Sequence, residues 1–308
     1  MSNEARTSVL PISETAENVI NLKGVSKTYE GKRGIPFWKV VHRISLWLKK
    51  LRIDAHSEWV EKMAAGTGDA TIIKDMDFTI PNKKEGEFIV LAGPSGCGKS
   101  TVLRFIADLA QPSVGTVLVH DVDVREHSPN LGMVFQDYSS FPWLTVLDNV
   151  ALGLKYQGIS KLEREKKAME MIKRVGLLGH EMKYAKRPTL SGGQLQRVAI
   201  ARSLLANPNV LLMDEPFNAL DIKTRVQMQD LLCSLFDELH PTIIMVTHDT
   251  REAAFLADSI YVMGKAPAKI EHHIVIPEGL RRSRDAQRTQ EFNDIVNGLD
   301  DTMMKLEN

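Results

Sequence analysis

The sequence has little cysteine and no excess of charge of either sign. Its 308 residues include two cysteines, Cys97 and Cys233, and 39 basic residues balance 39 acidic ones. Two cysteines are too few for a disulfide framework, and neither lies at metal-ligand spacing, so we expect reduced thiols in a cytosolic protein. A net charge of zero provides no overall field that would attract nucleic acid, so we expect no nucleic-acid partner.

Long hydrophobic runs are also missing, although 43% of the residues are hydrophobic. No stretch reaches the roughly 18 consecutive apolar residues that a membrane-spanning helix needs. Residues 1–19 have no basic start followed by an apolar run, so we expect no secretory signal. The composition predicts an ordinary globular chain with one large domain or two modest ones.

Short apolar strands alternate with helices over most of the chain. The continuous apolar runs typical of buried parallel strands are 87–93, 209–214, 242–248 and 259–264. The expected helices begin near Ser100 and span 192–206, 222–240 and 250–258, and 147–180 is rich in helix formers. This alternation predicts an α/β fold with a parallel sheet and helices on both of its faces.

Two further strands are expected at 19–29 and 70–80, separated by an insertion at about 31–69. Within the insertion, FWKVVHRISLWLKKL (37–51) places apolar residues on one face of a helix and carries basic but no acidic residues. Such a helix packs on the rest of the protein, binds a protein partner or lies on lipid. The sequence leaves these three alternatives open.

GPSGCGKST (93–101) follows an expected buried strand and opens a helix. It fits the pattern G-x-x-x-x-G-K-[ST], with Gly93, Gly98, Lys99 and Ser100 at the fixed positions. Glycines let backbone N–H groups surround phosphate oxygens, and the helix N-terminus adds its positive dipole end. We therefore expect Lys99 to meet the β- and γ-phosphates of a nucleotide and the Ser100 hydroxyl to bind Mg²⁺.

VLLMDEP (210–216) supplies carboxylates for the same chemistry. Its apolar strand ends at Asp214, which is placed to join the Mg²⁺ shell. Glu215 is the next carboxylate and is placed to accept a proton from an attacking water.

LSGGQ (190–194) is a second glycine-rich helix start. A serine at this place is by itself an ordinary N-cap, and the same serine and glycines can also offer a hydroxyl and N–H groups to an anion. Followed by QRVAIARSLLANPNVLLMDEP, the string resembles the signature of the ATP-binding cassette (ABC) superfamily. The resemblance runs from about residue 19 to 276, interrupted by the insertion.

The resemblance implies a P-loop ABC ATPase with a mostly parallel core sheet, a small antiparallel β-subdomain and a helical signature subdomain. It divides the chain into a disordered N-terminal segment (1–18), the ATPase domain (19–276) and a C-terminal helical tail (277–308). The tail has apolar residues at helical spacing, which predicts a terminal helix packed on the body. These residues are Phe292, Ile295, Val296, Leu299, Met303 and Leu306.

The resemblance also implies that ATP and Mg²⁺ are bound, with ATP held between two head-to-tail copies of the chain. Tyr29 would stack on adenine, His248 would contact the γ-phosphate, and Asp221 would end a loop that crosses to the second copy. The implied catalytic residues are Glu215, His248, Gln136 and Lys99, and the implied Mg²⁺ ligands are Ser100, Gln136 and Asp214. The implied ATP-binding residues are Tyr29, Gly93, Pro94, Ser95, Gly96, Cys97, Gly98, Lys99, Ser100, Thr101, Ser191, Gly192, Gly193, Gln194 and Asp221.

Finer strings resemble the nitrate/sulfonate/taurine importer subfamily, among them FPWLTVLDNVALGL (141–154) and THDTREAAFLADSIYVMGKAPAKI (247–270). This resemblance implies an ATPase that energises uptake of a small solute through two separate integral membrane permease subunits. A solute-binding protein outside the cytoplasm would act indirectly. The chain would lie peripherally on the cytoplasmic face of the bacterial inner membrane. FPWLT is a buried aromatic turn, the place where a permease docks, or both.

The alternative function is a soluble regulatory or remodelling ABC ATPase whose insertion binds a protein partner. Departures from the family pattern are the insertion itself, which lies close to Tyr29 in sequence, and two positions that usually hold glycine. These are Asp108, at a helix end, and Asn218, where we expect that a left-handed backbone is tolerated.

Overall fold

The protein is described here from a computed structural model that covers residues 16–29, 70–83, 85–126, 130–137 and 139–307. The insertion at 31–69, with its amphipathic stretch 37–51, and residues 1–15 lie outside the described residues.

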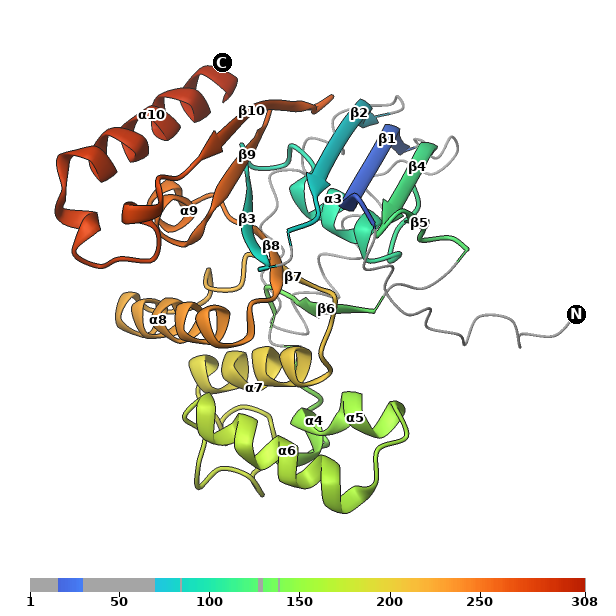
Figure 1. Ribbon diagram of the computed structural model, residues 1–308, viewed down its shortest axis with the longest axis vertical. Helices are drawn as coiled ribbons and strands as arrows, with labels where there is room; N and C mark the ends of the chain where they lie inside the picture. The colour runs from blue at the N-terminus through green and yellow to red at the C-terminus, as the bar shows by residue number, and fades with distance from the viewer. Residues whose placement is uncertain (1–15, 30–69, 84, 127–129, 138, 308) are drawn as a thin grey trace, which may run out of the picture.

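A six-stranded sheet lies at the centre of the molecule (Figure 1). In spatial order its strands are β10 (Ile270–Val275), β9 (Ser259–Met263), β3 (Glu87–Ala92), β8 (Thr242–Val246), β7 (Val210–Asp214) and β6 (Leu131–Val134). All neighbouring strands are parallel except the edge pair β10–β9. Every residue of β3, β7, β8 and β9 is buried, which explains their continuous apolar sequences. The expected α/β fold is confirmed.

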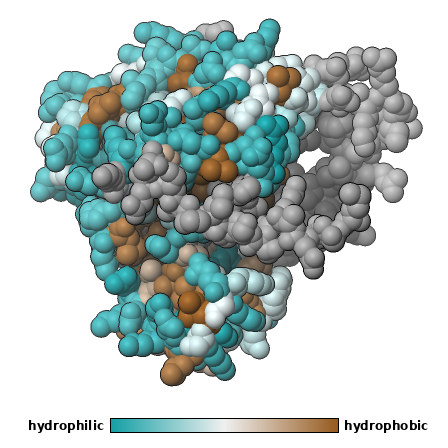
Figure 2. All heavy atoms as spheres, turned by 45° about the vertical axis from the view of Figure 1, so that its right-hand side comes forward, coloured by the Kyte–Doolittle hydropathy of each residue, from teal (hydrophilic) through white to brown (hydrophobic). Residues whose placement is uncertain are grey.

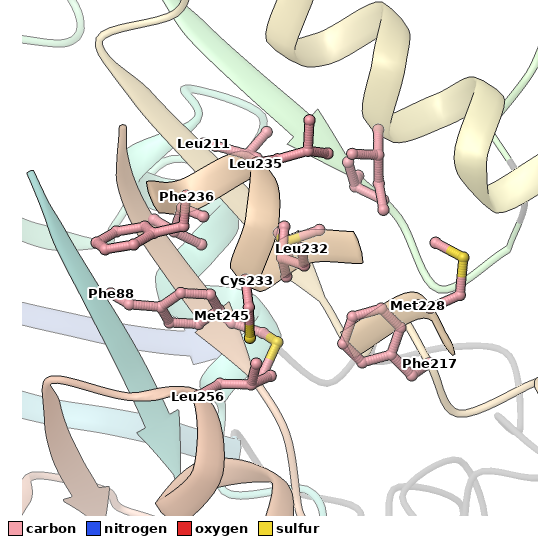
Figure 3. Packing of buried hydrophobic residues seen from close by; sticks show 14 of the residues in the cluster. Phe88, Leu211, Phe217, Met228, Leu232, Cys233, Leu235, Phe236, Met245 and Leu256 are labelled. Carbon is pink, nitrogen blue, oxygen red and sulfur yellow. The ribbon is translucent and has the colours of Figure 1, made fainter. Parts of the chain in front are cut away.

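Successive residues of each strand point to opposite faces of this sheet and enter two separate cores. On β3, for example, Phe88 and Val90 belong to one core and Ile89 and Leu91 to the other. The helices that cover the first face are α7 (Gly192–Leu205), α8 (Ile222–Leu239), α9 (Thr250–Leu256) and α10 (Gln290–Glu307). Figure 3 shows Phe88 and Met245 of the sheet packed against Leu232, Cys233 and Phe236 of α8.

The second face is covered by α3 (Lys99–Ile106) together with an antiparallel sheet, which is the small β-subdomain that the family resemblance implied in addition to the helices. The strands of that sheet are, in order, β2 (Ala70–Pro81), β1 (Asn18–Tyr29), β4 (Val114–Val119) and β5 (Val122–Asp123). Tyr29 and Ala70 are partners at the end of the β1–β2 pair. The chain therefore leaves for the insertion and returns from it at adjacent points.

Further helices extend the molecule on the side of α7 (Figure 1). They are α4 (Val146–Val150), α5 (Leu152–Tyr156) and α6 (Lys161–Arg174). After β10, the turns η1 (Glu278–Leu280) and η2 (Ala286–Arg288) lead to α10. Phe292, Val296 and Leu299 of α10 are buried in the core shared with α9, as expected of a packed terminal helix. None of the helices in the described part of the chain is both long and apolar enough to cross a bilayer.

Candidate ATP-hydrolysing site

The loop between β3 and α3 is shaped by glycine. Gly98 has a φ of 109°, and a Cβ there would lie 2.9 Å from Cγ2 of Ile72 on β2. At Gly93 a Cβ would lie 2.8 Å from the carbonyl oxygen of Met263, the last residue of β9. Only glycine combines these backbone angles with such close contacts. The loop is therefore fixed between the antiparallel sheet and the central sheet.

Lys99 closes this loop from inside. Its buried ammonium group donates hydrogen bonds to the carbonyl oxygens of Gly93, at 2.7 Å, and Pro94, at 2.8 Å. These partners are neutral, so the positive charge remains available to attract an anion at the loop. The residues of the loop thus match a phosphate-binding cradle at a helix N-terminus.

A hydroxyl–carboxylate pair joins the start of α3 to the end of β7. Ser100 Oγ donates a hydrogen bond of 2.7 Å to Oδ1 of Asp214, which is only 7% exposed. Burial raises the pKa of the Asp214 carboxyl, against the opposing effects of the Ser100 hydroxyl and the Arg104 and Lys99 charges. A cation beside Asp214 would offset the burial of its charge.

This pair fits Mg²⁺, which binds proteins through one or two oxygen ligands and completes its shell with phosphate oxygens and water. Within the described ranges, no group of three His, Cys, Asp or Glu residues is placed to hold a metal ion by itself. A magnesium ion here would therefore depend on the nucleotide for further ligands. Gln136, the other expected ligand, lies exposed just after the end of β6.

Glu215 and His248 form a second pair beside the first. Their atoms Oε1 and Nδ1 are 3.5 Å apart, and Asn218 Nδ2 donates a hydrogen bond of 3.0 Å to Glu215 Oε2. The His248 ring lowers the pKa of Glu215, and the Glu215 carboxylate in turn raises the pKa of His248. Glu215 is thereby kept ionised, as a base that accepts a proton must be.

A small cavity of about 40 Å³ lies at this pair. About 10–15 Å³ of such space is enough for one water molecule, so the cavity has room for water next to the Glu215 carboxylate. Its lining residues are Glu215, Phe217, Asn218, Arg225, Thr247, His248, Asp249 and Glu252.

Asp108 and Asn218, which stand where the family usually has glycine, differ from each other in backbone conformation. Asp108, just after α3, has a φ of 54° and takes the left-handed place usual for glycine. Asn218 does not: the left-handed residue of its loop is Glu215, with a φ of 46°. The tolerance expected of Asn218 is therefore not called upon, and its side chain donates a hydrogen bond to Glu215.

The LSGGQ segment forms a capped helix start. Ser191 Oγ accepts a hydrogen bond from Gln194 N at 3.3 Å, and Gln194 Oε1 accepts one from Ser191 N at 2.9 Å. A Cβ at Gly193 would lie 2.5 Å from Cγ2 of Thr224, so α7 starts close against α8. Asp221 caps α8, accepting hydrogen bonds from Thr224 N at 3.0 Å and Thr224 Oγ1 at 2.7 Å.

The structure thus brings together some of the expected site residues and leaves others apart. Lys99, Ser100, Asp214, Glu215 and His248 gather at the carboxyl ends of adjacent strands. The start of α7 belongs to the helical part of the molecule, whereas α3 lies beside the antiparallel sheet (Figure 1). Tyr29 ends β1 in that sheet, with the Lys27 ammonium 5.1 Å from its ring centroid.

Sequence reasoning missed the residues behind His248, namely Thr247, Asp249 and Glu252. Asp249 and Glu252 are spaced as in a capping box, a signal that could have drawn attention to them. Asp249 does cap α9 by accepting a hydrogen bond from Glu252 N. The Glu252 side chain, however, turns inward to Thr247 and Gln229.

A phosphate loop after a parallel strand, with a hydroxyl–carboxylate pair and a carboxylate–histidine pair beside it, defines a P-loop nucleotide-hydrolysing protein. A family model described as ABC transporter matches residues 73–218. The nitrate import ATP-binding protein of Synechocystis is 46% identical over 209 residues, 68% of this chain and 77% of that protein. The chain belongs to the ABC transporter family, whose ATP-binding proteins are ATPases coupled to transport.

Two further comparisons agree with this assignment. The aliphatic sulfonates import ATP-binding protein of Zymomonas mobilis is 41% identical over 239 residues, 77% of this chain and 94% of that protein. A solved dimeric ATP-binding cassette in a post-hydrolysis state, bound to ADP and Pi, is 32% identical with a TM-score of 0.63. That comparison covers 84% of this chain and 99% of the solved one. The expected importer subfamily is therefore supported by relatives named for import.

Proposed function

We propose that this chain is the ATP-hydrolysing subunit of an importer and energises uptake of a small solute of the nitrate, sulfonate or taurine class through a separate permease. The observation that carries the proposal is the gathering of the phosphate loop, the Ser100–Asp214 pair and the Glu215–His248 pair at one edge of the central sheet. Relatives named for nitrate and sulfonate import support the solute class.

Within this proposal the phosphate loop and Lys99 bind the β- and γ-phosphates of ATP. Ser100 and Asp214, with Gln136, hold Mg²⁺, which when bound neutralises developing charge on phosphate oxygens. Glu215 accepts the proton of the attacking water, and His248 holds the γ-phosphate.

The site is completed by a second copy of the chain in the proposed assembly. Ser191, Gly192, Gly193 and Gln194 lie in the helical part of the molecule, away from the loop of their own chain, so they are free to cover ATP bound to a partner. Asp221 would lie at the same interface, and Tyr29 would stack on the adenine. The similarity to a solved dimeric cassette supports this arrangement.

Two integral membrane permease subunits are the proposed partners on the helical side. Figure 2 shows hydrophobic residues on the lower part of the face it views, which is this helical region. Trp143, a few residues before α4, is 68% exposed, and its ring lies against Phe141 with centroids 5.3 Å apart. Through the permease the chain would lie peripherally on the cytoplasmic face of the bacterial inner membrane, with a solute-binding protein acting from the other side. Since relatives are named for nitrate, sulfonate and taurine import, this role is favoured over a soluble remodelling ATPase.

Replacing Glu215 by glutamine tests the chemistry. Glu215→Gln removes the base and keeps the side-chain shape, so we expect ATP binding to be retained and turnover to fall by about 10²–10⁴-fold. Steady-state phosphate release measures turnover, and size-exclusion chromatography with ATP should show the closed dimer accumulating.

The matched control is Glu238→Gln, since Glu238 is a surface residue of α8 paired with Arg174. This variant should hydrolyse ATP at the normal rate. Normal turnover in Glu215→Gln would remove Glu215 from the role of base. The importer assignment is tested separately by co-expression with the candidate permease, and failure to co-purify with any integral membrane protein would count against it.

A further inference from the structure

A chain of hydrogen bonds runs from the loop that carries His248 to the segment that follows β10. Thr247 Oγ1 donates to Oε2 of Glu252 at 2.6 Å. Gln229 Nε2, on α8, donates to Oε1 of Glu252 at 3.0 Å. Arg284 Nη2 donates to Oε1 of Gln229 at 3.1 Å. Residues far apart in the sequence are thus connected through the interior.

The inner members of this chain are buried. Thr247 is 3% exposed, Glu252 6% and Gln229 7%. Burial raises the pKa of Glu252, while its hydrogen bonds from Thr247 and Gln229 act in the opposite direction. Buried polar groups are costly when they lose a partner, so each hydrogen bond of the chain constrains its neighbours strongly.

The series of hydrogen bonds holds the backbone on both sides of His248. Asp249 N donates to Thr247 Oγ1 at 3.1 Å, and Glu252 N donates to Asp249 Oδ1 at 2.9 Å. Thr247, Asp249 and Glu252 are also walls of the small cavity that Glu215 and His248 share. A shift of Glu252 would therefore be passed to His248 through its two sequence neighbours, Thr247 and Asp249.

The outer end of the chain is anchored by Arg284. Its Nε donates to Oδ1 of Asp230 at 2.8 Å, and its guanidinium lies 4.0 Å from the ring centroid of Phe255 on α9. These contacts fix the guanidinium where it can hold Gln229.

We propose that Glu252, Gln229 and Arg284 are positioning residues for His248, so that the segment after β10 sets the geometry of the hydrolytic site. The inference rests on the proposed function of His248 in ATP hydrolysis. It predicts that breaking the series of hydrogen bonds slows ATP turnover. ATP affinity, which depends on the phosphate loop, is preserved.

The protein contains a matched pair of arginines for the test. Arg282 belongs to the same segment, pairs with Asp258 at 2.9 Å and lies 4.5 Å from the ring centroid of Phe236. Like Arg284, it pairs with a carboxylate and lies over an aromatic ring. Its partners, however, do not belong to the series of hydrogen bonds behind His248. Arg284→Ala and Arg282→Ala therefore remove similar packing, and only the first releases Gln229.

The experiment measures kcat and KM for ATP in the full-length chain, together with the melting temperature. We expect Arg284→Ala to lower kcat by about tenfold with KM within about twofold of the wild type, since a displaced catalytic group costs up to about 10²-fold. Arg284→Lys, which keeps one donor, should recover part of kcat. Gln229→Met, which keeps the shape of the side chain and breaks both hydrogen bonds, should reproduce the loss. Arg282→Ala should leave kcat and KM unchanged, whatever its melting temperature.

Equal loss of kcat in Arg282→Ala and Arg284→Ala would overturn the inference, because the effect would then follow general packing. Unchanged kcat in Gln229→Met would overturn it as well. Failure of the proposed function has a different signature: the wild-type chain would itself release no phosphate from ATP, or Glu215→Gln would be fully active.

Discussion

Glu215 and His248 shift the pKa of each other through their contact. Glu215 has a lowered pKa, so the stability it contributes is present above its ordinary pKa of 4.5 and is lost as the pH falls through the lowered value. His248 has a raised pKa, so its contribution is present below its ordinary pKa of 6.5 and is lost as the pH rises through the raised value. The pair therefore stabilises the fold most between these two ordinary values.

His248→Ala should accordingly lower the melting temperature more at pH 6 than at pH 9. We expect a difference of about 1–2 °C, because the His248 side chain is half exposed and the pair is screened by solvent. Thermal unfolding of wild type and variant at the two pH values measures it. Leu162→Ala, at an exposed and non-titratable residue of α6, is the control and should show the same effect at both pH values. An equal shift for His248→Ala at pH 6 and pH 9 would contradict the assignment.

The site residues that carry a spacing rule were predictable from the sequence, and those that depend on tertiary contacts were not. Lys99 and Ser100 follow from the glycine pattern, and Asp214 and Glu215 from the end of a buried strand. The chain behind His248 joins Thr247, Gln229 and Arg284, whose links span up to 55 residues of sequence. No local pattern encodes such links, because they exist only once α8, α9 and the segment after β10 have packed together.

At the level of elements, the start of α8 combines a structural contact with a proposed functional one. Asp221 caps the helix through Thr224 and is also the residue proposed to meet the second copy of the chain. The two roles require different chemistry. A cap needs an oxygen acceptor, which asparagine also provides, whereas a contact that depends on charge needs the carboxylate.

We expect Asp221→Ala to lower the melting temperature by about 2–4 °C and Asp221→Asn to leave it nearly unchanged. Loss of ATPase activity in both variants would assign the carboxylate to the proposed interface. If ATPase activity falls only in Asp221→Ala, the variant with the lower melting temperature, the carboxylate acts in capping alone. A melting temperature unaffected by Asp221→Ala would mean that the cap does not stabilise α8.

Most elements of the central sheet were predictable for a physical reason. Strands buried on both faces must be apolar throughout, and 87–93, 209–214, 242–248 and 259–264 contain β3, β7, β8 and β9. β10 has no such signal, because Glu271, His272 and His273 are exposed at the sheet edge. Its conformation depends on antiparallel pairing with β9. The proposed domain boundaries, by contrast, remain predictions.

For the whole molecule, the proposed insertion at about 31–69 is the feature that would set this chain apart from a plain cassette. The described residues that flank it, Tyr29 and Ala70, are paired across β1 and β2. Each doubling of a connection adds only about 0.6 kcal/mol of closure entropy, so a short linker can replace a long one without strain.

Replacing residues 33–67 by a short Gly-Ser linker should therefore leave the melting temperature and the ATPase rate near those of the full chain. Assembly with the permease and binding to anionic liposomes, measured separately, then show which of the three roles the segment 37–51 has. Loss of either binding alone identifies a protein or a lipid partner. A large fall in melting temperature would show that the segment packs on the cassette and would contradict the expected independence.

The pairing of Tyr29 with Ala70 also has a mechanical meaning. The residues that flank the insertion form one cross-strand pair at the end of the β1–β2 ladder. A force that pulls on the insertion would therefore separate the β1–β2 pairs one after another, starting from this end. After the rungs Tyr29–Ala70 and Thr28–Thr71, the next pair is Lys27–Ile73. A Cβ at Gly98 would lie 3.3 Å from the Ile73 side chain, so this rung borders the phosphate loop. Tension on the insertion would thus reach the nucleotide site within three residues.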